Sequence, residues 1–181
     1  MDRERALSLI KEKVKNKNLI KHMLAVEQVM RALARKFGED EEIWALAGLI
    51  HDLDVEETAR TPERHGKITA EILEKEGVSQ DIIYAVLAHS GQVPCRNLMD
   101  KALYAADPLT GLIVACALVA REKKLENVDV DFIKRRWKEK RFAMGASREQ
   151  IQSCEQMGIS RNEFIQIGLL AMKEIAEELG L

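Results

Sequence analysis

Four histidines and two aspartates are the side chains of this sequence best suited to binding a metal ion. The histidines are the only four in the chain, and none follows His89. Each falls near the inward edge or the start of a different predicted helix. Imidazole and carboxylate ligands together suit iron, manganese, zinc, cobalt or nickel better than calcium, which takes oxygen ligands. The candidate ligands are His22, His51, Asp52, His65, His89 and Asp107.

The stretch Ala45–Asp54, ALAGLIHDLD, contains the most informative pair. No residue is charged between Ile43 and Ile50, which predicts a helix buried on every side. This helix ends in His51-Asp52, and a buried carboxylate without a partner is unfavourable. A single histidine near a core is more often a structural group, but four histidines with an adjacent aspartate favour a metal ion as that partner.

The elements that must position these side chains are helices, because helical periodicity dominates and no alternating strand pattern occurs. We therefore expect an all-α fold in one domain, residues 1–181. A metal-binding core covers about 18–120, and helices at about 128–181 pack on it. Pro108 disfavours helical geometry at the residue before it, which predicts a break or kink at Asp107. The predicted helices are about 2–15, 18–37, 39–51, 64–75, 79–90, 98–107, 112–121, 131–142, 148–157 and 161–179, with a polar loop at 53–63.

The composition excludes several classes of protein. Charged residues make up 32% of the 181 residues and the formal net charge is only −2, so no overall field favours nucleic acid or a membrane. Three widely spaced cysteines without a CxxC motif indicate reduced thiols. The N-terminal segment lacks the apolar core of a signal peptide, and the uncharged run after Pro108 is too short to span a bilayer. We expect a cytoplasmic protein; its oligomeric state is not indicated.

The order His22 … His51-Asp52 … Asp107 resembles the HD superfamily of metal-dependent phosphohydrolases. His65 in ERHGKITAEIL and His89 in VLAHSG resemble the H…HD…H…H…D variant, and the likeness covers about residues 18–120. The resemblance implies one metal held by His22, His51, Asp52 and Asp107. It implies a second metal held by His65 and His89, bridged by Asp52. Both would be divalent transition metals, with iron or manganese favoured, and would activate water for attack on a phosphoryl group.

One departure from the family concerns the residues after His51-Asp52. Many relatives continue Ile-Gly-Lys, with the lysine placed to meet phosphate, whereas this chain reads Leu53-Asp54-Val55-Glu56. Asp54 is either a partner that orients His51 or a bound water, or an ordinary helix-end carboxylate. The phosphate contact must come from another base. Among Arg60, Arg64, Lys67, Arg96 and Lys101 we select Lys101 and Lys67, which with Asp52 form the predicted catalytic set.

The basic segment KRRWKEKR, residues 134–141, is the other conspicuous motif. It fits a nucleic-acid or phosphate patch, but the solvated side of an amphipathic helix is favoured because the whole chain is mildly acidic. We therefore expect a hydrolase of a phosphoester or phosphoanhydride of a nucleotide or small phosphorylated metabolite, with no nucleic-acid partner. Two alternatives stay open: a di-iron oxidative enzyme on the same scaffold, and a non-catalytic metal- and nucleotide-binding module.

Overall fold

A computed structural model describes all 181 residues of the chain. It contains helices and turns but no strand, which confirms the predicted all-α class. Four short 3-10 helices lie between the α-helices: η1 (Pro62–Arg64), η2 (Arg121–Lys123), η3 (Leu125–Asn127) and η4 (Ser153–Met157). The α-helices are α1 (Arg3–Lys13), α2 (Lys17–Phe37), α3 (Glu41–Ile50), α4 (Lys67–Lys75), α5 (Gln80–His89), α6 (Leu98–Val119), α7 (Val130–Trp137), α8 (Arg148–Gln152), α9 (Arg161–Glu174) and α10 (Ala176–Leu179).

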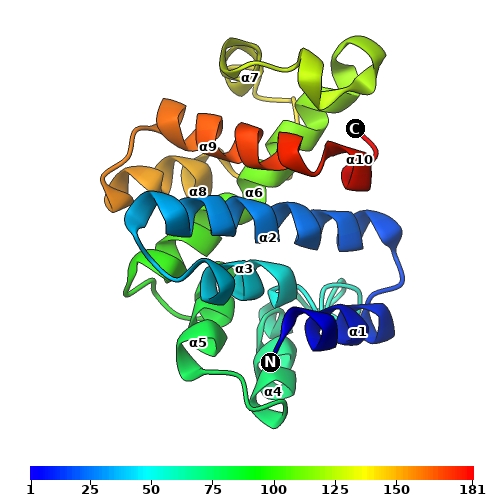
Figure 1. The fold of residues 1–181 in the computed structure, drawn as a ribbon, viewed down its shortest axis with the longest axis vertical. Coiled ribbons are helices and arrows are strands. Elements are labelled where there is room, and N and C mark those ends of the chain that lie inside the picture. Colours follow the sequence, from blue (N-terminus) through cyan, green and yellow to red (C-terminus); the bar gives the residue numbers. More distant parts are fainter.

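Helix α2 crosses the middle of the molecule and separates two groups of helices. Helices α1, α3, α4 and α5 lie on one side of it, and α7, α8 and α9 on the other (Figure 1). The long helix α6 contacts α2, α3 and α5 as well as α7, α8 and α9. One continuous cluster of buried apolar side chains therefore runs through both groups, including Met23, Leu49, Leu103, Leu109 and Phe164.

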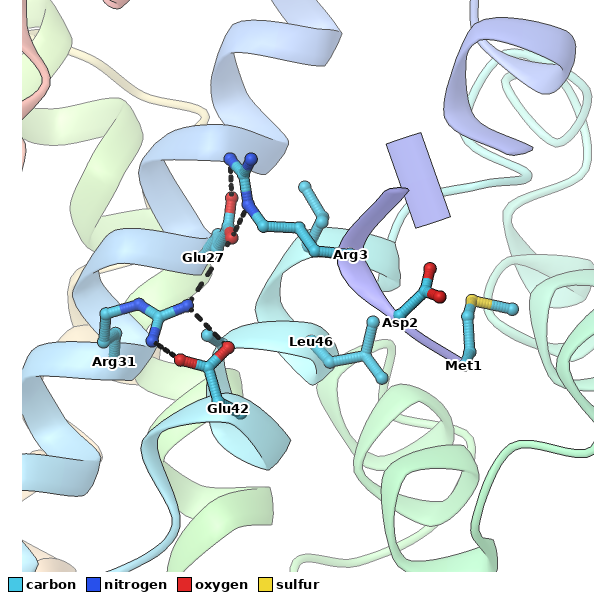
Figure 2. Close-up of a pocket in the computed structure, with 9 residues that line it drawn as sticks. Met1, Asp2, Arg3, Glu27, Arg31, Glu42 and Leu46 are labelled. Atoms are coloured by element: carbon cyan, nitrogen blue, oxygen red, sulfur yellow. Dashed lines mark hydrogen bonds and ion pairs between the residues drawn. The ribbon is translucent and has the colours of Figure 1, made fainter. Parts of the chain in front are cut away.

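Helix α1 is attached to α2 and α3 at the mouth of a pocket by a group of charged side chains (Figure 2). The guanidinium of Arg3 pairs with both carboxylate oxygens of Glu27, one of them at 3.0 Å. Arg31 reaches both Glu27 and Glu42 and so joins α2 to the start of α3. Glu27 is only 5% exposed, and a carboxylate so buried requires partners of this kind.

The closest approach of α2 to α3 is made possible by a glycine. A Cβ atom at Gly48 would lie 2.8 Å from the carbonyl oxygen of Val26, so any other residue here would force the two backbones apart. His22 lies one helical turn before Val26, and His51 lies about one turn after Gly48. The contact therefore brings these two predicted ligands together from separate helices.

Of the break or kink predicted at Asp107, the break is wrong, because α6 continues from Leu98 to Val119 with Pro108 inside it. An interior proline costs a helix about 3 kcal/mol. Leu109, Leu112 and Ile113 are each fully buried, and burying each such side chain contributes roughly 1.5–3 kcal/mol. Packing therefore outweighs the proline. The continuous helix is long and apolar enough to cross a membrane by length and composition, but 61% of its most apolar stretch is buried inside this fold, as in a core helix.

Smaller differences concern helix ends and burial. Helix α3 is not buried on every side, because Ile43 is 44% exposed. Helix α4 starts at Lys67, three residues later than predicted. Helix α7 ends at Trp137, five residues before the predicted end at Phe142. The last predicted helix divides at Ile175 into α9 and α10.

Candidate metal centre

The fold brings all six predicted ligands to one place, where α2, α3, α5 and α6 meet. Helix α2 supplies His22, and the residues just after α3 supply His51 and Asp52. The segment before α4 supplies His65, the last residue of α5 is His89, and Asp107 lies in the middle of α6. His51 and His89 are buried, whereas the side chains of His22, His65 and Asp107 are 23–29% exposed. The site therefore opens to solvent along the edge formed by these three.

The carboxylate of Asp52 lies at the centre of the group. Its Oδ2 faces the Nε2 atom of His22 at 3.7 Å. Its Oδ1 faces the Nε2 atoms of three histidines, at 3.5 Å for His51, 3.3 Å for His65 and 3.5 Å for His89. The two oxygens of one carboxylate thus point towards different histidines, as a bridging ligand requires.

Asp107 completes the side of the site near His22. Its Oδ1 lies 3.0 Å from Nε2 of His22 and 3.9 Å from Nε2 of His51. Ligand atoms within 4.8 Å of one another form two sets, His22–His51–Asp107 and His51–Asp52–His89. His51 belongs to both sets, so the division of the residues between two metals stays a prediction.

Each histidine has its other ring nitrogen held by a partner outside the group. Nδ1 of His51 donates to the carbonyl oxygen of Gly48 at 2.7 Å, and Nδ1 of His89 donates to that of Val86. A carbonyl oxygen only accepts, so Nδ1 carries the proton in both rings and Nε2 presents a lone pair. This is the tautomer that a histidine needs to bind a metal through Nε2.

His22 is held in the same way by Thr110, a residue that the sequence did not single out. The Thr110 hydroxyl donates to the carbonyl oxygen of Asp107 at 2.9 Å, so its oxygen is free to accept from Nδ1 of His22 at 3.0 Å. Thr110 is fully buried. Its only signal in the sequence is its place one turn after Asp107, which no motif marks.

Asp54 holds His65, and not His51 as the sequence suggested. Its Oδ1 accepts from Nδ1 of His65 at 2.8 Å, and its Oδ2 accepts from the backbone N–H of Thr69 at 3.0 Å. The Asp54 side chain is fully buried. Gly66 packs this segment against the end of α5: its backbone is left-handed, and a Cβ there would lie 3.0 Å from Cβ of Ser90 and 3.2 Å from the carbonyl oxygen of Val86. The two acids after His51-Asp52 therefore differ in role, because Glu56 is exposed.

Two buried nitrogen atoms at the centre have no hydrogen-bond partner: Nε2 of His51 and Nε2 of His89. Both lone pairs face the Oδ1 atom of Asp52, and a lone pair opposite a carboxylate oxygen is repulsive unless a cation lies between them. A proton on Nε2 of His51 cannot be that cation near neutral pH, because burial lowers the pKa of this histidine to about 4. Unsatisfied buried groups are rare in folded proteins and need an explanation. A transition metal ion fits both atoms.

The carboxylates and histidines of the site shift one another's pKa values. Burial alone would raise the pKa of Asp52, but the histidines around it, His51 first, hold that pKa well below its usual range. Burial, the largest single influence, would lower the pKa of His22, but the hydrogen bond to Asp107 and the negative charges of Asp107 and Asp52 together outweigh it, so the pKa is raised. The pKa of His65 is raised in the same way by Asp54 and Asp52. Ionised carboxylates are the form that binds metal.

The two lysines predicted to bind phosphate make no polar contact with the candidate metal ligands. Lys67 starts α4 with an exposed side chain, and Lys101 is half-buried on α6. Neither makes a hydrogen bond or an ion pair with a candidate ligand. The other nearby bases are also exposed, and Arg96 stacks on the ring of Tyr84. The source of a phosphate contact therefore stays a prediction.

Comparison with known proteins identifies one family. The sequence model described as "HD domain" matches residues 19–132 of the chain. A Ribonuclease Y from Oleidesulfovibrio alaskensis is 32% identical over 112 residues, 62% of this chain and 21% of that protein. A Ribonuclease Y from a Sulfurovum species is 27% identical over 165 residues, 90% of this chain and 32% of that protein. The chain thus spans about a fifth to a third of the length of these relatives. No solved structure gives a significant match.

Proposed function

The chain belongs to the HD domain family, and from this we propose that it is a metal-dependent phosphohydrolase acting on a nucleotide or another small phosphorylated metabolite. In the proposed reaction a water oxygen bonds to phosphorus, the phosphoester or phosphoanhydride P–O bond breaks, and the leaving oxygen takes a proton. One observation carries the proposal. The Nε2 atoms of four histidines, each with its Nδ1 held elsewhere, converge on the Asp52 carboxylate.

The ligand set supports two divalent transition metal ions, with iron or manganese favoured. Zinc, cobalt and nickel bind the same types of ligand. We assign one to His22, His51, Asp52 and Asp107 and the other to His65 and His89, with Asp52 shared. When bound, such ions acidify water and neutralise phosphoryl oxygens. The chain's own part is to hold the ligands in the required tautomers, through Thr110 at His22 and Asp54 at His65.

The phosphoryl group would enter along the exposed edge of the site, beside His22, His65 and Asp107. Lys101 lies six residues before Asp107, which is about 9 Å along a helix. At 3.6 residues per turn, six residues also place Lys101 about a third of a turn round the helix from Asp107, so the contact depends on the flexible four-carbon stem of the lysine. We keep Lys101, and Lys67 next to His65-Gly66, as the proposed phosphate-contacting residues, on their proximity along α6 and α4.

A second candidate is hydrolysis of RNA, and it rests on the name of the relatives, Ribonuclease Y. The similarity covers only the part of those proteins that this chain spans. The charge of this chain does not favour a polyanion, since its formal net charge is −2. In the basic segment, Lys134 pairs with Asp131 and Arg136 pairs with Glu139. We therefore rank a small phosphorylated substrate first.

Metal analysis combined with a substrate screen tests the proposal. The protein is purified without a histidine tag, its metal content is measured before and after loading with manganese or iron, and phosphate release is followed with nucleotides and sugar phosphates. We expect close to two equivalents of metal and phosphate release that a chelator abolishes. Cleavage of an RNA oligonucleotide with no turnover of small esters would favour the second candidate. Oxygen uptake without phosphate release would favour the di-iron oxidative enzyme, and tight nucleotide binding without turnover the binding module.

A further inference from the structure

An apolar trough begins at the open edge of the metal centre and follows the exposed face of α6. Two adjoining hollows, of about 410 Å³ and 390 Å³, form it. His22 lines both hollows, and so do Gly111, Val114 and Leu118 of α6. These three lie three or four residues apart and so share one face of the helix. The trough is therefore continuous with the metal centre through His22, and through Asp107 in the larger hollow.

The walls of the trough come from two other parts of the chain. Ala143, Gly145 and Ala146, which lie just after the basic segment, line the larger hollow. Asn18, Lys21 and Leu179–Leu181, at the end of α10 and just beyond it, line the other. Lys21 is the one lysine or arginine among all these lining residues, and its Nζ donates to the carbonyl oxygen of Leu179 at 2.7 Å. Apart from the ligands of the metal centre, the trough has almost no charge.

The floor of the trough is an exposed apolar face on a helix that is mostly buried. Leu118 is 50% exposed, and exposed apolar surface beside polar groups often marks a binding site. Gly111 leaves the middle of the floor open, since no atom lies within 4 Å of the place where its Cβ would be. Hollows of this volume match those that bind small molecules, which are mostly apolar with a few polar groups at one end. Here the polar end is the metal centre.

We infer that the trough binds the uncharged, apolar or aromatic organic group of a phosphate monoester whose phosphate lies at the metal centre. This inference rests on the proposed function and narrows its substrate to small esters with an organic group of about the size of a nucleobase. A nucleic-acid strand is a poor occupant, because each bound phosphate is normally met by a lysine or arginine. A purely polar sugar phosphate leaves the trough empty.

Binding of two phosphonates tests the inference without relying on turnover. 1-Naphthylmethylphosphonate and methylphosphonate share the phosphoryl group, and their carbon–phosphorus bonds resist hydrolysis. Their affinities for the manganese-loaded protein are measured by calorimetry. We expect the naphthyl compound to bind at least about tenfold more tightly, as burial of an aromatic group in an apolar site allows. Equal affinities of the two compounds would overturn the inference.

Substitutions of Gly111 locate the binding group. Gly111→Leu fills the open floor, and we expect it to remove the advantage of the naphthyl compound while metal content and methylphosphonate affinity stay unchanged. Gly111→Ala is the matched control, because one methyl group leaves most of the space open. If the naphthyl compound still binds more tightly than methylphosphonate in Gly111→Leu, the inference is overturned. It is also overturned if Gly111→Leu changes the oligomeric state without any effect on binding, because the trough would then be a contact between copies of the chain. Failure of the proposed function is distinct: no ester would be hydrolysed, whatever the phosphonates do.

Discussion

Replacing Asp54 with asparagine tests whether the residue behind His65 controls the metal centre. The two side chains have almost the same shape, so the change is one of hydrogen bonding. Asp54 now accepts from two donors, Nδ1 of His65 and the backbone N–H of Thr69. An amide has one acceptor oxygen and one donor nitrogen, so asparagine satisfies only one of them in the present arrangement. If its oxygen stays with Thr69, its N–H₂ group faces His65 and favours the tautomer with the proton on Nε2.

That tautomer cannot bind a metal through Nε2, the atom that faces Asp52 at 3.3 Å. Loss of a partner of this kind typically lowers metal affinity 10- to 100-fold, which is roughly 1.4–2.8 kcal/mol at about 1.4 kcal/mol per decade. If the oxygen instead stays with His65, the buried N–H of Thr69 is left unsatisfied, at about 1–3 kcal/mol of folding stability. Asp54→Asn therefore lowers either the metal affinity or the folding stability.

Both quantities are measurable on one sample. Metal titration with manganese gives the affinity of the site that contains His65, and thermal unfolding of the metal-free protein gives the stability. Imidazole ¹⁵N shifts report the tautomer of His65 directly. Glu57→Gln, at an exposed carboxylate three residues away, is the matched control and should change none of them. Unaltered metal affinity, stability and His65 tautomer in Asp54→Asn would refute the assigned role of Asp54.

Four further outcomes follow from the site. Asp52→Ala should abolish binding of both metals and leave the helical circular dichroism in place; retained metal and activity would contradict the shared ligand. His65→Ala or His89→Ala should lower the metal content from two equivalents towards one, as measured by elemental analysis. Metal affinity should rise with pH through and above about 6.5, by up to about tenfold per pH unit for each proton displaced. The reason is that His22 and His65 have raised pKa values and so carry protons that the metal must displace. Metal titrations at two pH values, with proton release measured, check this. Gly111→Ala should stabilise the protein by about 0.5–1 kcal/mol, raising the melting temperature by a few degrees.

The sequence alone was sufficient to predict the helices and the types of ligand. The alternation of apolar and charged residues every three to four positions is a local signal, and it predicted nearly every helix of the fold. The uncharged stretch Ile43–Ile50 ending in His51-Asp52 likewise predicted that a carboxylate would be carried into the core. Only local physics is needed for such predictions, because each depends on residues within one or two turns.

The continuity of α6 shows where local signals fail. Pro108 disfavours a helix by its own covalent geometry, and a prediction from neighbours alone places a break there. The helix persists because Leu109, Leu112 and Ile113 bury their side chains against other helices. That contribution comes from residues distant in the sequence, so no window around Pro108 contains it.

The arrangement of the metal centre was decided by the tertiary structure for the same reason. Two glycines allow close packing, Gly48 against Val26 and Gly66 against Ser90 and Val86, and this brings candidate ligands from separate segments together. The partners that set the histidine tautomers, Thr110 and Asp54, become visible only when the helices are packed. So does the trough on α6. The sequence by itself determined which candidate metal-binding side chains the chain carries and on which helices, through residue types and local periodicity. Only the packed structure decided which atoms face one another, because those distances depend on contacts between helices far apart in the chain.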